Sequence, residues 1–452
     1  MNRSVRRLVI SVLAAGLVAT ACSATTGGGN ASPVNTASGA SHAPVTLNVW
    51  SFYTGREFKQ YSDVLNAFTS KYPWITIHHT PGKVDQDYVR AINAGQAPDV
   101  AISAGPDNVA KFCSTQAYQD LTPFLQTDGM DISKIVPPQA LRYTSYQGDQ
   151  CTLPVLSDAY GLYYNTDMFA SKRIASPPKS YTELVADAKK LTVFNPDGSI
   201  KIAGFVPISS FYENVNFFNG VYSGSTWYDA AGKSAFASDP SWAALLTWQK
   251  NFITSVFGSD GYNKLNRFYG QLGGADSEFS SSQAFEVGKI AMLFDGEWRT
   301  AFIADDKAKV KWNTAPFPVA DAVPSRYGAG QIGGDVLGIP KGAQHPAEAW
   351  LLVKYLATDT GAEIQLAKTL GNVPTTYDSL KDPSLTADPR FKVFLDIFAN
   401  AQSDFKALTP IGSADADLWD AFIGKYEAGN AGDLQGGLQQ LASQIDKQSS
   451  LG

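Results

Sequence analysis

The stretch Gly288–Phe302 (GKIAMLFDGEWRTAF) brings aromatic, acidic and basic side chains to a point where a strand is expected to give way to a helix. Ile290–Phe294 is a short apolar run that predicts a buried strand, and Asp295-Gly296 breaks it. Open α/β sheets bind ligands beyond the carboxyl ends of their strands. Trp298, just after this turn, is therefore a candidate platform for the apolar face of a ligand, with packing between helix and sheet as the alternative.

Acidic residues near other predicted strand ends raise the question of catalysis. A glycoside hydrolase would need two carboxylates across a cleft, one of them with a raised pKa. On paper Asp158, Glu213, Asp295 and Asp335 could supply them, but no spacing singles out a pair, and no GxSxG or HExxH motif is present. We expect no catalytic residue, and a secreted carbohydrate-active enzyme is the alternative.

Metal and cofactor chemistry have little support in the sequence. The chain has no CxxC pair, no histidine cluster and only four histidines. Zinc sites are built from such groups of cysteine and histidine. We therefore expect no metal site and no cofactor.

The N-terminus predicts export. Three arginines precede the apolar run Leu8–Val18, which is too short to span a bilayer and is typical of a secretory signal. The small residues before Cys22 are similar to a bacterial lipobox, although Ala19 stands where that pattern prefers leucine. We expect residues 1–21 to be removed and Cys22 to carry lipid, with ordinary secretory cleavage as the alternative.

Residues 22–44 are expected to form a flexible tether, because Ser23–Pro44 has no formal charge and only Val34 as a large apolar side chain. Loss of residues 1–21 removes three arginines, so 33 basic against 42 acidic side chains leave a net charge of −9. An acidic body argues against nucleic acid or anionic lipid as a ligand. We expect an extracytoplasmic monomer, anchored by its lipid to the outer face of the bacterial cell membrane.

The two remaining cysteines, Cys113 and Cys151, are expected to form a disulfide, which export permits. The bridge would close a loop of about 39 residues and contribute on the order of 4 kcal/mol in the chain-entropy treatment. Two separate buried thiols are the alternative.

Strand and helix patterns alternate along the mature chain and predict an α/β fold. Val45–Trp50, Ile75–His79 and Val100–Ser103 have the pattern of strands in strand–helix units, which predicts a parallel sheet covered by helices. The pattern predicts further strands at Leu153–Val155, Gly161–Asn165 and Ile200–Val206, a loop at Leu121–Leu125, and helices at Phe58–Thr69, Tyr181–Leu191 (capped by Thr182), Trp242–Phe252, His345–Ala357, Phe391–Ala399, Leu418–Glu427 and Leu434–Gln444.

Several segments, taken in order, resemble the extracellular solute-binding protein family 1. These segments are GQAPDV at 95–100, GLYYNTDMF at 161–169, PKSYTELVADAKKLT at 178–192, GKIAMLFDGEWRTAF at 288–302, GGDVLGIPKGAQHPAEAWLLVKYLA at 333–357 and LGNVPTTYD at 370–378. The family comprises sugar-binding lipoproteins of ABC importers and includes the maltose-binding protein. The resemblance runs along nearly the whole mature chain, and the set of motifs carries it.

The resemblance implies a two-lobed periplasmic-binding-protein fold of type II, in which each lobe is a central sheet covered by helices, with a hinge between the lobes. Lobe 1 is expected to comprise residues 45–157 and 318–372, and lobe 2 residues 158–317 and 373–452. The implied function is capture of a neutral mono- or oligosaccharide by hinge closure and its delivery to the transmembrane subunits of an ABC permease. The protein itself would do no chemistry.

A sugar site needs aromatic faces for ring C–H groups and planar polar groups for hydroxyls. The resemblance places Trp298 at the family's stacking tryptophan and Asp158 at a cleft carboxylate, with Tyr160 beside it. It also places Gly333, Gly334 and Asp335 in a glycine turn at the cleft edge, where glycine lets the backbone approach a ligand.

Other candidates follow predicted strands or lie in the C-terminal region. Arg299 could reach a hydroxyl or pair with Asp295. The maltose-binding members use charged residues in the loop after the first strand, which this chain lacks, so we do not expect a maltodextrin preference. The further candidate contacts are Phe52, Tyr53, Ser103, Asp107, Tyr212, Trp227 and Trp419, the last with core packing as an equal alternative.

Other solutes and roles remain as alternatives: iron, a glycerophosphodiester, or a structural lipoprotein with an empty cleft. Related two-lobed proteins bind ferric ion through adjacent tyrosines, but Tyr163 and Tyr164 lie within a predicted strand and point to opposite faces. An anionic ligand would need several basic residues at the cleft, and only Arg56 and Arg299 are placed for it. We therefore predict a neutral saccharide.

Overall fold

Two five-stranded sheets organise the protein in a computed structural model that describes residues 42–211 and 219–450. The strands are β1 (Val45–Ser51), β2 (Ile75–Thr80), β3 (Val100–Ser103), β4 (Leu153–Pro154), β5 (Leu156–Asn165), β6 (Val193–Phe194), β7 (Ile200–Ile202), β8 (Met292–Gly296), β9 (Trp312–Ala315), β10 (Ile332–Gly333), β11 (Val336–Gly338) and β12 (Val373–Pro374). Strands β6 and β7 form a separate small ribbon.

The first sheet has the order β2-β1-β3-β11-β4. Strand β1 runs parallel to both β2 and β3, and this confirms the predicted parallel start of the fold. Strand β11, from much later in the chain, is inserted antiparallel between β3 and β4. The carboxyl ends of β1 and β3 therefore lie beside the amino end of β11, which begins just after Asp335.

The second sheet is built around β5, which pairs antiparallel with β8, β9, β10 and β12. Strand β5 follows β4 of the first sheet almost directly, and β11 of the first sheet follows β10 of the second. The chain thus passes from one sheet to the other near residue 155 and near residue 334. It passes again between α13 and β12, near residue 371.

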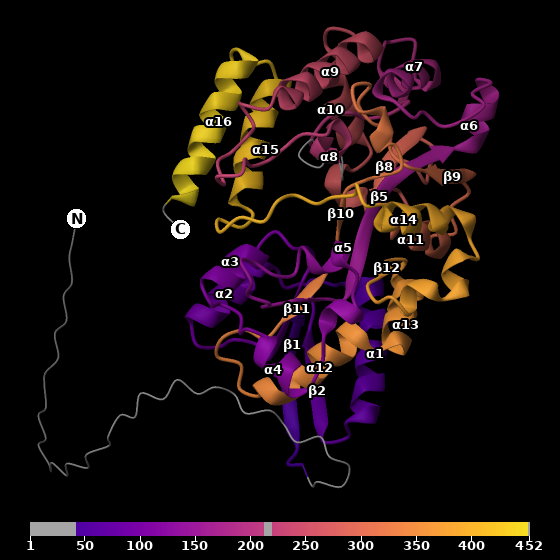
Figure 1. Ribbon diagram of the computed structural model, residues 1–452. Helices are drawn as coiled ribbons and strands as arrows, with labels where there is room; N and C mark the ends of the chain where they lie inside the picture. The colour runs from indigo at the N-terminus through magenta and orange to yellow at the C-terminus, as the bar shows by residue number, and fades with distance from the viewer. Residues whose placement is uncertain (1–41, 212–218, 451–452) are drawn as a thin grey trace, which may run out of the picture. The chain divides into compact units, whose positions relative to one another are not determined.

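Helices cover both sheets, and their bounds are as follows: α1 (Gly55–Lys71), α2 (Asp85–Asn93), α3 (Val109–Ser114), α4 (Thr122–Thr127), α5 (Pro138–Leu141), α6 (Thr166–Ser171), α7 (Tyr181–Leu191), α8 (Asn219–Ser223), α9 (Pro240–Phe257), α10 (Gly261–Gln271), α11 (Arg299–Asp305), α12 (Pro346–Thr358), α13 (Thr360–Leu370), α14 (Pro389–Ala399), α15 (Ala414–Glu427) and α16 (Leu434–Ser449). Figure 1 shows α1 and α12 beside β1 and β2. Helix α14 packs on β5 and β9, and α15 packs on α16.

The long predicted helices are confirmed because their apolar spacing matches a buried face. In α1, Tyr61, Val64, Leu65 and Phe68 are buried, and in α12 Ala349, Trp350, Val353 and Leu356 are buried. Helix α7 is confirmed as well, but its cap is Ser180, whose hydroxyl accepts from the Glu183 N–H, and not Thr182.

Three expectations about local structure are wrong. Asp158–Tyr160 lies between the predicted strands Leu153–Val155 and Gly161–Asn165 and is expected to separate them, but it lies inside β5, which is buried on both faces and so shows no alternation. Leu121–Leu125 opens the short helix α4, not a loop. Residues 319–333 stay with the second sheet, through a bridge from Val319 to Ser180 and through β10, so the chain returns to the first sheet after Gly333 and not at residue 318.

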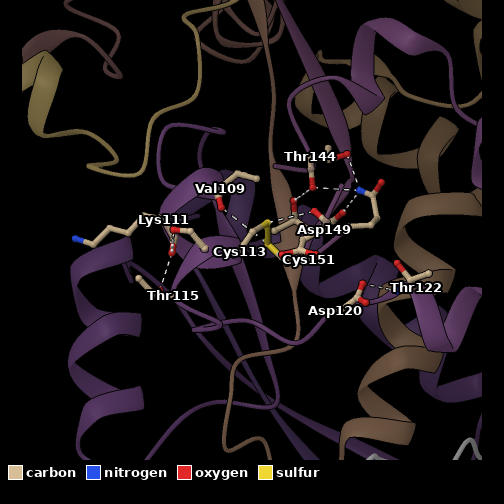
Figure 2. The surroundings of a disulfide bond; sticks show 12 residues. Val109, Lys111, Cys113, Thr115, Asp120, Thr122, Thr144, Asp149 and Cys151 are labelled. Carbon is tan, nitrogen blue, oxygen red and sulfur yellow. Dashed lines mark hydrogen bonds between the residues drawn. A yellow bond between two sulfur atoms is a disulfide. The ribbon is translucent and has the colours of Figure 1, made fainter. Parts of the chain in front are cut away.

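A disulfide joins Cys113 in α3 to Cys151, just before β4, with the Cα atoms 5.4 Å apart (Figure 2). Both cysteines are buried. The Cys113 sulfur lies 3.5 Å from the Asp149 carbonyl oxygen. The bridge ties α3 to the segment that leads into β4, the edge strand of the first sheet, across 38 positions of sequence.

Within residues 42–211 and 219–450, no helix is long and apolar enough to cross a membrane. The predicted signal segment 1–21, the predicted lipid attachment at Cys22 and the candidate Tyr212 lie outside the described residues.

Candidate functional site

Trp298 is the partly exposed member of an otherwise buried stretch. Strand β8 ends at Gly296, and residues 291–299 are all buried except this tryptophan. A Cβ at Gly296 would lie 2.2 Å from Cζ3 of the Trp298 ring, so only glycine leaves room for the ring there. The ring meets Tyr160 of β5 edge to face, with centroids 5.3 Å apart.

Asp158 and Glu297 are buried carboxylates joined by one amide. The Asn372 Nδ2 donates to Asp158 Oδ1 at 2.9 Å and to Glu297 Oε1 at 3.1 Å. The other Glu297 oxygen accepts from the Ala159 N–H at 2.7 Å. Strand β5 and the residue that follows β8 therefore hold the two acids next to each other, and Glu297 directly precedes Trp298 in the chain.

Asp335 brings a third carboxylate from the start of β11. Its Oδ2 accepts from the Tyr53 hydroxyl, and Tyr53 follows β1. Tyr53 is buried and its ring lies 4.1 Å from that of Phe52, which is half-buried. We call Asp158, Glu297 and Asp335 the carboxylate cluster; it joins the strand ends of the first sheet to the core strand of the second.

Gly334 allows this close approach. Its φ is +140°, which favours glycine, and a Cβ there would lie 2.3 Å from the Leu156 carbonyl oxygen. Its neighbour Gly333 pairs with Asp158 across β10 and β5, and the Gly333 carbonyl accepts from the Ser157 hydroxyl at 2.8 Å. The glycine turn thus packs Asp335 directly against the beginning of β5.

Burial dominates the electrostatics of the carboxylate cluster. It raises the pKa of Asp158 to about 7, opposed by the Asn372 amide and reinforced by Glu57. Burial and the charge of Asp158 hold the pKa values of Glu297 and Asp335 well above the ordinary range. The Tyr53 hydroxyl opposes this rise in the pKa of Asp335.

Arg299 is placed differently from the expectation that listed it among ligand contacts. It is fully buried, with Nε 2.6 Å from Asp295 Oδ2 and Nη1 3.2 Å from Glu286 Oε1. Of the two roles open to it in the sequence, the structure has the ion pair with Asp295. A buried, paired guanidinium of this kind holds α11 on β8.

Two candidates, Ser103 and Asp107, lie at or after the carboxyl end of β3. Strands β1 and β3 are parallel, so this is the end of the first sheet from which Tyr53 also follows. Ser103 is buried at the end of β3. Asp107 is partly exposed and lies 3.2 Å from Lys406 Nζ, which also contacts Asp415 at 2.7 Å. Lys406 is buried, and a buried charge needs partners, which these two carboxylates supply.

Trp227 lines a cavity of about 440 Å³. Its walls also contain Arg142, Tyr146, Tyr228, Asp404 and Phe405. The Asp404 backbone bonds to Gly330 and Ile332, next to the strand that pairs with Asp158, so this cavity lies near the carboxylate cluster. Arg142 lies over the Phe405 ring at 5.4 Å and 3.5 Å from Asp404.

Trp419 lies in the core. It is fully buried in α15, and its ring packs on Phe236 and Trp242 at centroid distances of 5.1 and 5.0 Å. The core alternative for this residue is therefore the one found, because α15 turns its apolar face onto α9.

The structure adds two residues that the sequence did not single out as site residues, Glu297 and Asn372. Both stood in recognised motifs, but nothing in their spacing signals a contact across 75 positions. The signal that could have found Asn372 is its place after the cap Gly371, since a polar residue that enters a buried crossing strand needs partners.

The arrangement suits recognition of a polyhydroxylated ring. An indole face can cover C–H groups while carboxylate oxygens accept from hydroxyls. Within the described ranges, no group of three or more His, Cys, Asp or Glu is placed to hold a metal ion. The site offers oxygen acceptors and an aromatic face.

Comparison with solved structures identifies the fold. CpMnBP1 with mannotriose bound has a TM-score of 0.77 and 22% identity, covering 88% of this chain and 99% of that one. Maltose-bound T. maritima MalE3 has a TM-score of 0.72 and 23% identity, covering 89% and 99%. The predicted α/β fold with two lobes is confirmed by these likenesses.

Sequence comparison gives the family. A Deinococcus radiodurans protein described as a "Probable ABC transporter-binding protein" is 26% identical over 312 residues, which are 65% of this chain and 69% of that protein. The profile described as bacterial extracellular solute-binding protein matches residues 55–363, more than half of the chain. The chain belongs to the bacterial extracellular solute-binding protein family.

Proposed function

We propose that this protein captures a neutral mono- or oligosaccharide outside the cytoplasm and delivers it to the transmembrane subunits of an ABC permease. The observation that carries the proposal is the partly exposed Trp298 ring, which directly follows the buried Glu297 in the chain, together with the Asn372 amide that joins Glu297 to the buried Asp158. Such a pairing of aromatic face and hydrogen-bond acceptors matches the two surfaces of a sugar ring. Proteins of this fold have been solved with mannotriose and with maltose bound.

A neutral ligand is favoured because the two arginines best placed for an anion are already engaged. Arg299 pairs with Asp295 and Glu286. Arg56 donates to the Thr369 carbonyl at 2.7 Å and lies 3.3 Å from Asp305. A phosphorylated ligand would have to displace these bonds and would face three buried carboxylates.

Capture would occur by hinge closure. We assign one lobe to residues 45–155 and 335–371, and the other to residues 156–333 and 373–450, because these segments supply the first and second sheets. The hinge would lie where the chain passes between the sheets, near residues 155, 334 and 371–372. A ligand on Trp298 and Asp335 would contact both lobes and so favour the closed form.

The lipid anchor is part of the same proposal. Cleavage before Cys22 and lipidation of its sulfur would leave residues 23–44 as a tether, so the body would remain near the membrane without a spanning helix. Mass spectrometry of the protein extracted from membranes, with a Cys22→Ser variant as control, tests it. A mature protein of unmodified mass, released from membranes in both forms, would rule the anchor out.

The test of function is a calorimetric screen of the protein lacking residues 1–44 against glucose, mannose, maltose, mannobiose and mannotriose, with product analysis of the same mixtures. We expect saturable binding of at least one saccharide and no hydrolysis. Turnover would move the protein to the enzyme alternative. Binding of a phosphosugar or glycerophosphodiester with no neutral competitor would contradict the neutral ligand.

A further inference from the structure

Asn372 occupies the point where the chain passes from α13 to β12. Helix α13 ends at Leu370, and Gly371, with a φ of +85°, is its left-handed cap. A Cβ at Gly371 would lie 3.0 Å from the Ala301 Cβ and 3.4 Å from the Trp298 Cα, so this backbone packs directly behind the tryptophan. The crossing segment is therefore in contact with the turn that carries the proposed sugar platform.

The Asn372 side chain satisfies two acids with one nitrogen. Its Nδ2 lies 2.9 Å from Asp158 and 3.1 Å from Glu297, one N–H for each. The opposite amide orientation would turn its oxygen toward both carboxylates, so the donor assignment follows from the partners. Asn372 is about nine-tenths buried, so water cannot easily replace it.

The groups that face Asp158 are otherwise acids and tyrosine. Glu57 comes from α1, Tyr143 from the segment after α5, Glu297 from the end of β8 and Asp335 from the start of β11. Like charges and burial both disfavour the ionised carboxylate. The Asn372 amide acts in the opposite direction, because it donates to the charged form.

We propose that Asn372 is a positioning residue for saccharide binding: it holds Asp158 ionised and correctly oriented to accept a hydrogen bond from a sugar hydroxyl. This inference rests on the proposed function. An ionised carboxylate is the stronger acceptor. Because Asn372 belongs to a crossing segment, movement of that segment would also release Asp158, which links the acceptor to the conformation of the hinge.

The test compares the wild type with Asn372→Ala by titration calorimetry with mannotriose and maltose between pH 5.5 and 9. Wild-type affinity should rise through pH 7 as Asp158 ionises. In Asn372→Ala the pH midpoint should move up by about one unit, so the affinity should fall about fivefold at pH 7 and about tenfold at pH 5.5, with most of the loss recovered at pH 9. A loss of equal size at every pH, or no loss, would overturn the proposal.

A matched control separates positioning from general destabilisation. Asn165 is also a buried asparagine on β5, but its side chain caps α6 by accepting from the Met168 N–H at 3.0 Å. Asn165→Ala should cost stability without moving the pH midpoint of binding. In an Asp158→Asn background, Asn372→Ala should produce no further shift of that midpoint. A shift of the same size in either case would contradict a role through Asp158.

If neither sugar binds, the inference is tested by thermal unfolding of the ligand-free protein. In that event the proposed function loses these ligands, while the link between Asn372 and Asp158 can still be measured as the pH dependence of Tm. Between pH 7 and 8, Tm should fall more steeply in Asn372→Ala than in the wild type, because Asp158 keeps its proton to a higher pH in the variant. An unchanged profile would overturn the inference.

Discussion

At the scale of single residues, the site depends on the Trp298 ring, which fits only because residue 296 is a glycine and has no side chain. Trp298 lies across Gly296, and its other neighbour Tyr160 meets it edge to face. Trp298 could be singled out from the sequence because a strand, a turn and a tryptophan follow one another there. Asp158 and Asp335 were also expected, from the family resemblance, but Glu297 and Asn372 were not, because they meet only through the fold.

Gly296→Ala should therefore weaken sugar binding without unfolding the protein. The added methyl would meet the ring at 2.2 Å and push Trp298 off its position. We expect at least a tenfold loss of affinity, measured by calorimetry, and a small loss of Tm. Gly270→Ala in α10, where the methyl has open space, is the control and should leave the affinity unchanged and raise Tm slightly, because alanine favours a helix more than glycine does. Full affinity in Gly296→Ala would show that the ring position is unimportant.

At the scale of elements, Arg56 links α1 to α11 and α13. Its guanidinium lies 4.5 Å from the Phe302 ring centroid and 3.3 Å from Asp305 Oδ2, and it bonds to the Thr369 carbonyl. Helix α1 covers the first sheet and α11 follows β8 of the second. This contact therefore joins the two proposed lobes.

Arg56→Ala should weaken sugar binding severalfold, because a contact that holds the lobes together favours the closed form. The effect should shrink at high salt, since Asp305 is more than half exposed. The matched control is Lys59→Ala, which removes an exposed pair with Asp63 one turn along the same helix. Equal affinities for the two variants in salt-dependent calorimetry would argue against the link.

The disulfide between Cys113 and Cys151 is a second link between elements, because it joins α3 to the edge of the first sheet. Cys113→Ser with Cys151→Ser should lower the free energy of unfolding by about 2–4 kcal/mol in urea titrations. Sugar affinity should stay within about twofold, because neither cysteine contacts the carboxylate cluster. Unchanged stability would mean that the bridge restrains little in the unfolded chain.

Helices whose apolar residues recur at helical spacing could be predicted from the sequence. A strand that is apolar along both faces could not be bounded in this way. Helices α1 and α12 show their buried faces in the sequence. Strand β5 is buried along both faces, so the polar Asp158 predicts a break where the structure has a strand residue with buried partners. The sequence likewise leaves two roles open for Arg299, contact with a ligand hydroxyl or an ion pair with Asp295. Only the fold brings Glu286, 13 positions away, to Arg299, and this contact favours the ion pair.

At the scale of the whole molecule, the carboxylate cluster should make the ligand-free protein more stable in mild acid. Burial raises the pKa of Asp158 to about 7 and holds those of Glu297 and Asp335 well above the usual range. In the unfolded chain these groups ionise near pH 4. The folded protein thus binds more protons, so stability falls as the pH rises from about 4 until the folded pKa values are passed.

We accordingly expect a higher Tm at pH 5.5 than at pH 8 by scanning calorimetry. Asp158→Asn, which cannot ionise, should reduce that difference. Saturating saccharide should reduce it as well, because a sugar hydroxyl that donates to Asp158 stabilises the ionised form. A Tm that rises from pH 5.5 to pH 8 in the wild type would contradict the description of the cluster.

The passage of the chain back and forth between two sheets agrees with what the family resemblance implies, whereas the point of return to the first sheet was not predictable. Residues 319–333 carry no pattern that assigns them to either sheet; the pairing of β10 with β5 does so. That pairing also places the Gly334 turn against Asp158, so the site exists only when both sheets are formed.

The central claim is that Trp298 and the carboxylate cluster bind a neutral saccharide. The most direct measurement is titration calorimetry of the protein lacking residues 1–44 with the saccharide series above, on the wild type and on Trp298→Ala. We predict saturable binding of a sugar by the wild type and a loss of about a hundredfold or more in Trp298→Ala, with Tm little changed. Equal binding by both proteins, or none by the wild type with any sugar, would contradict the account.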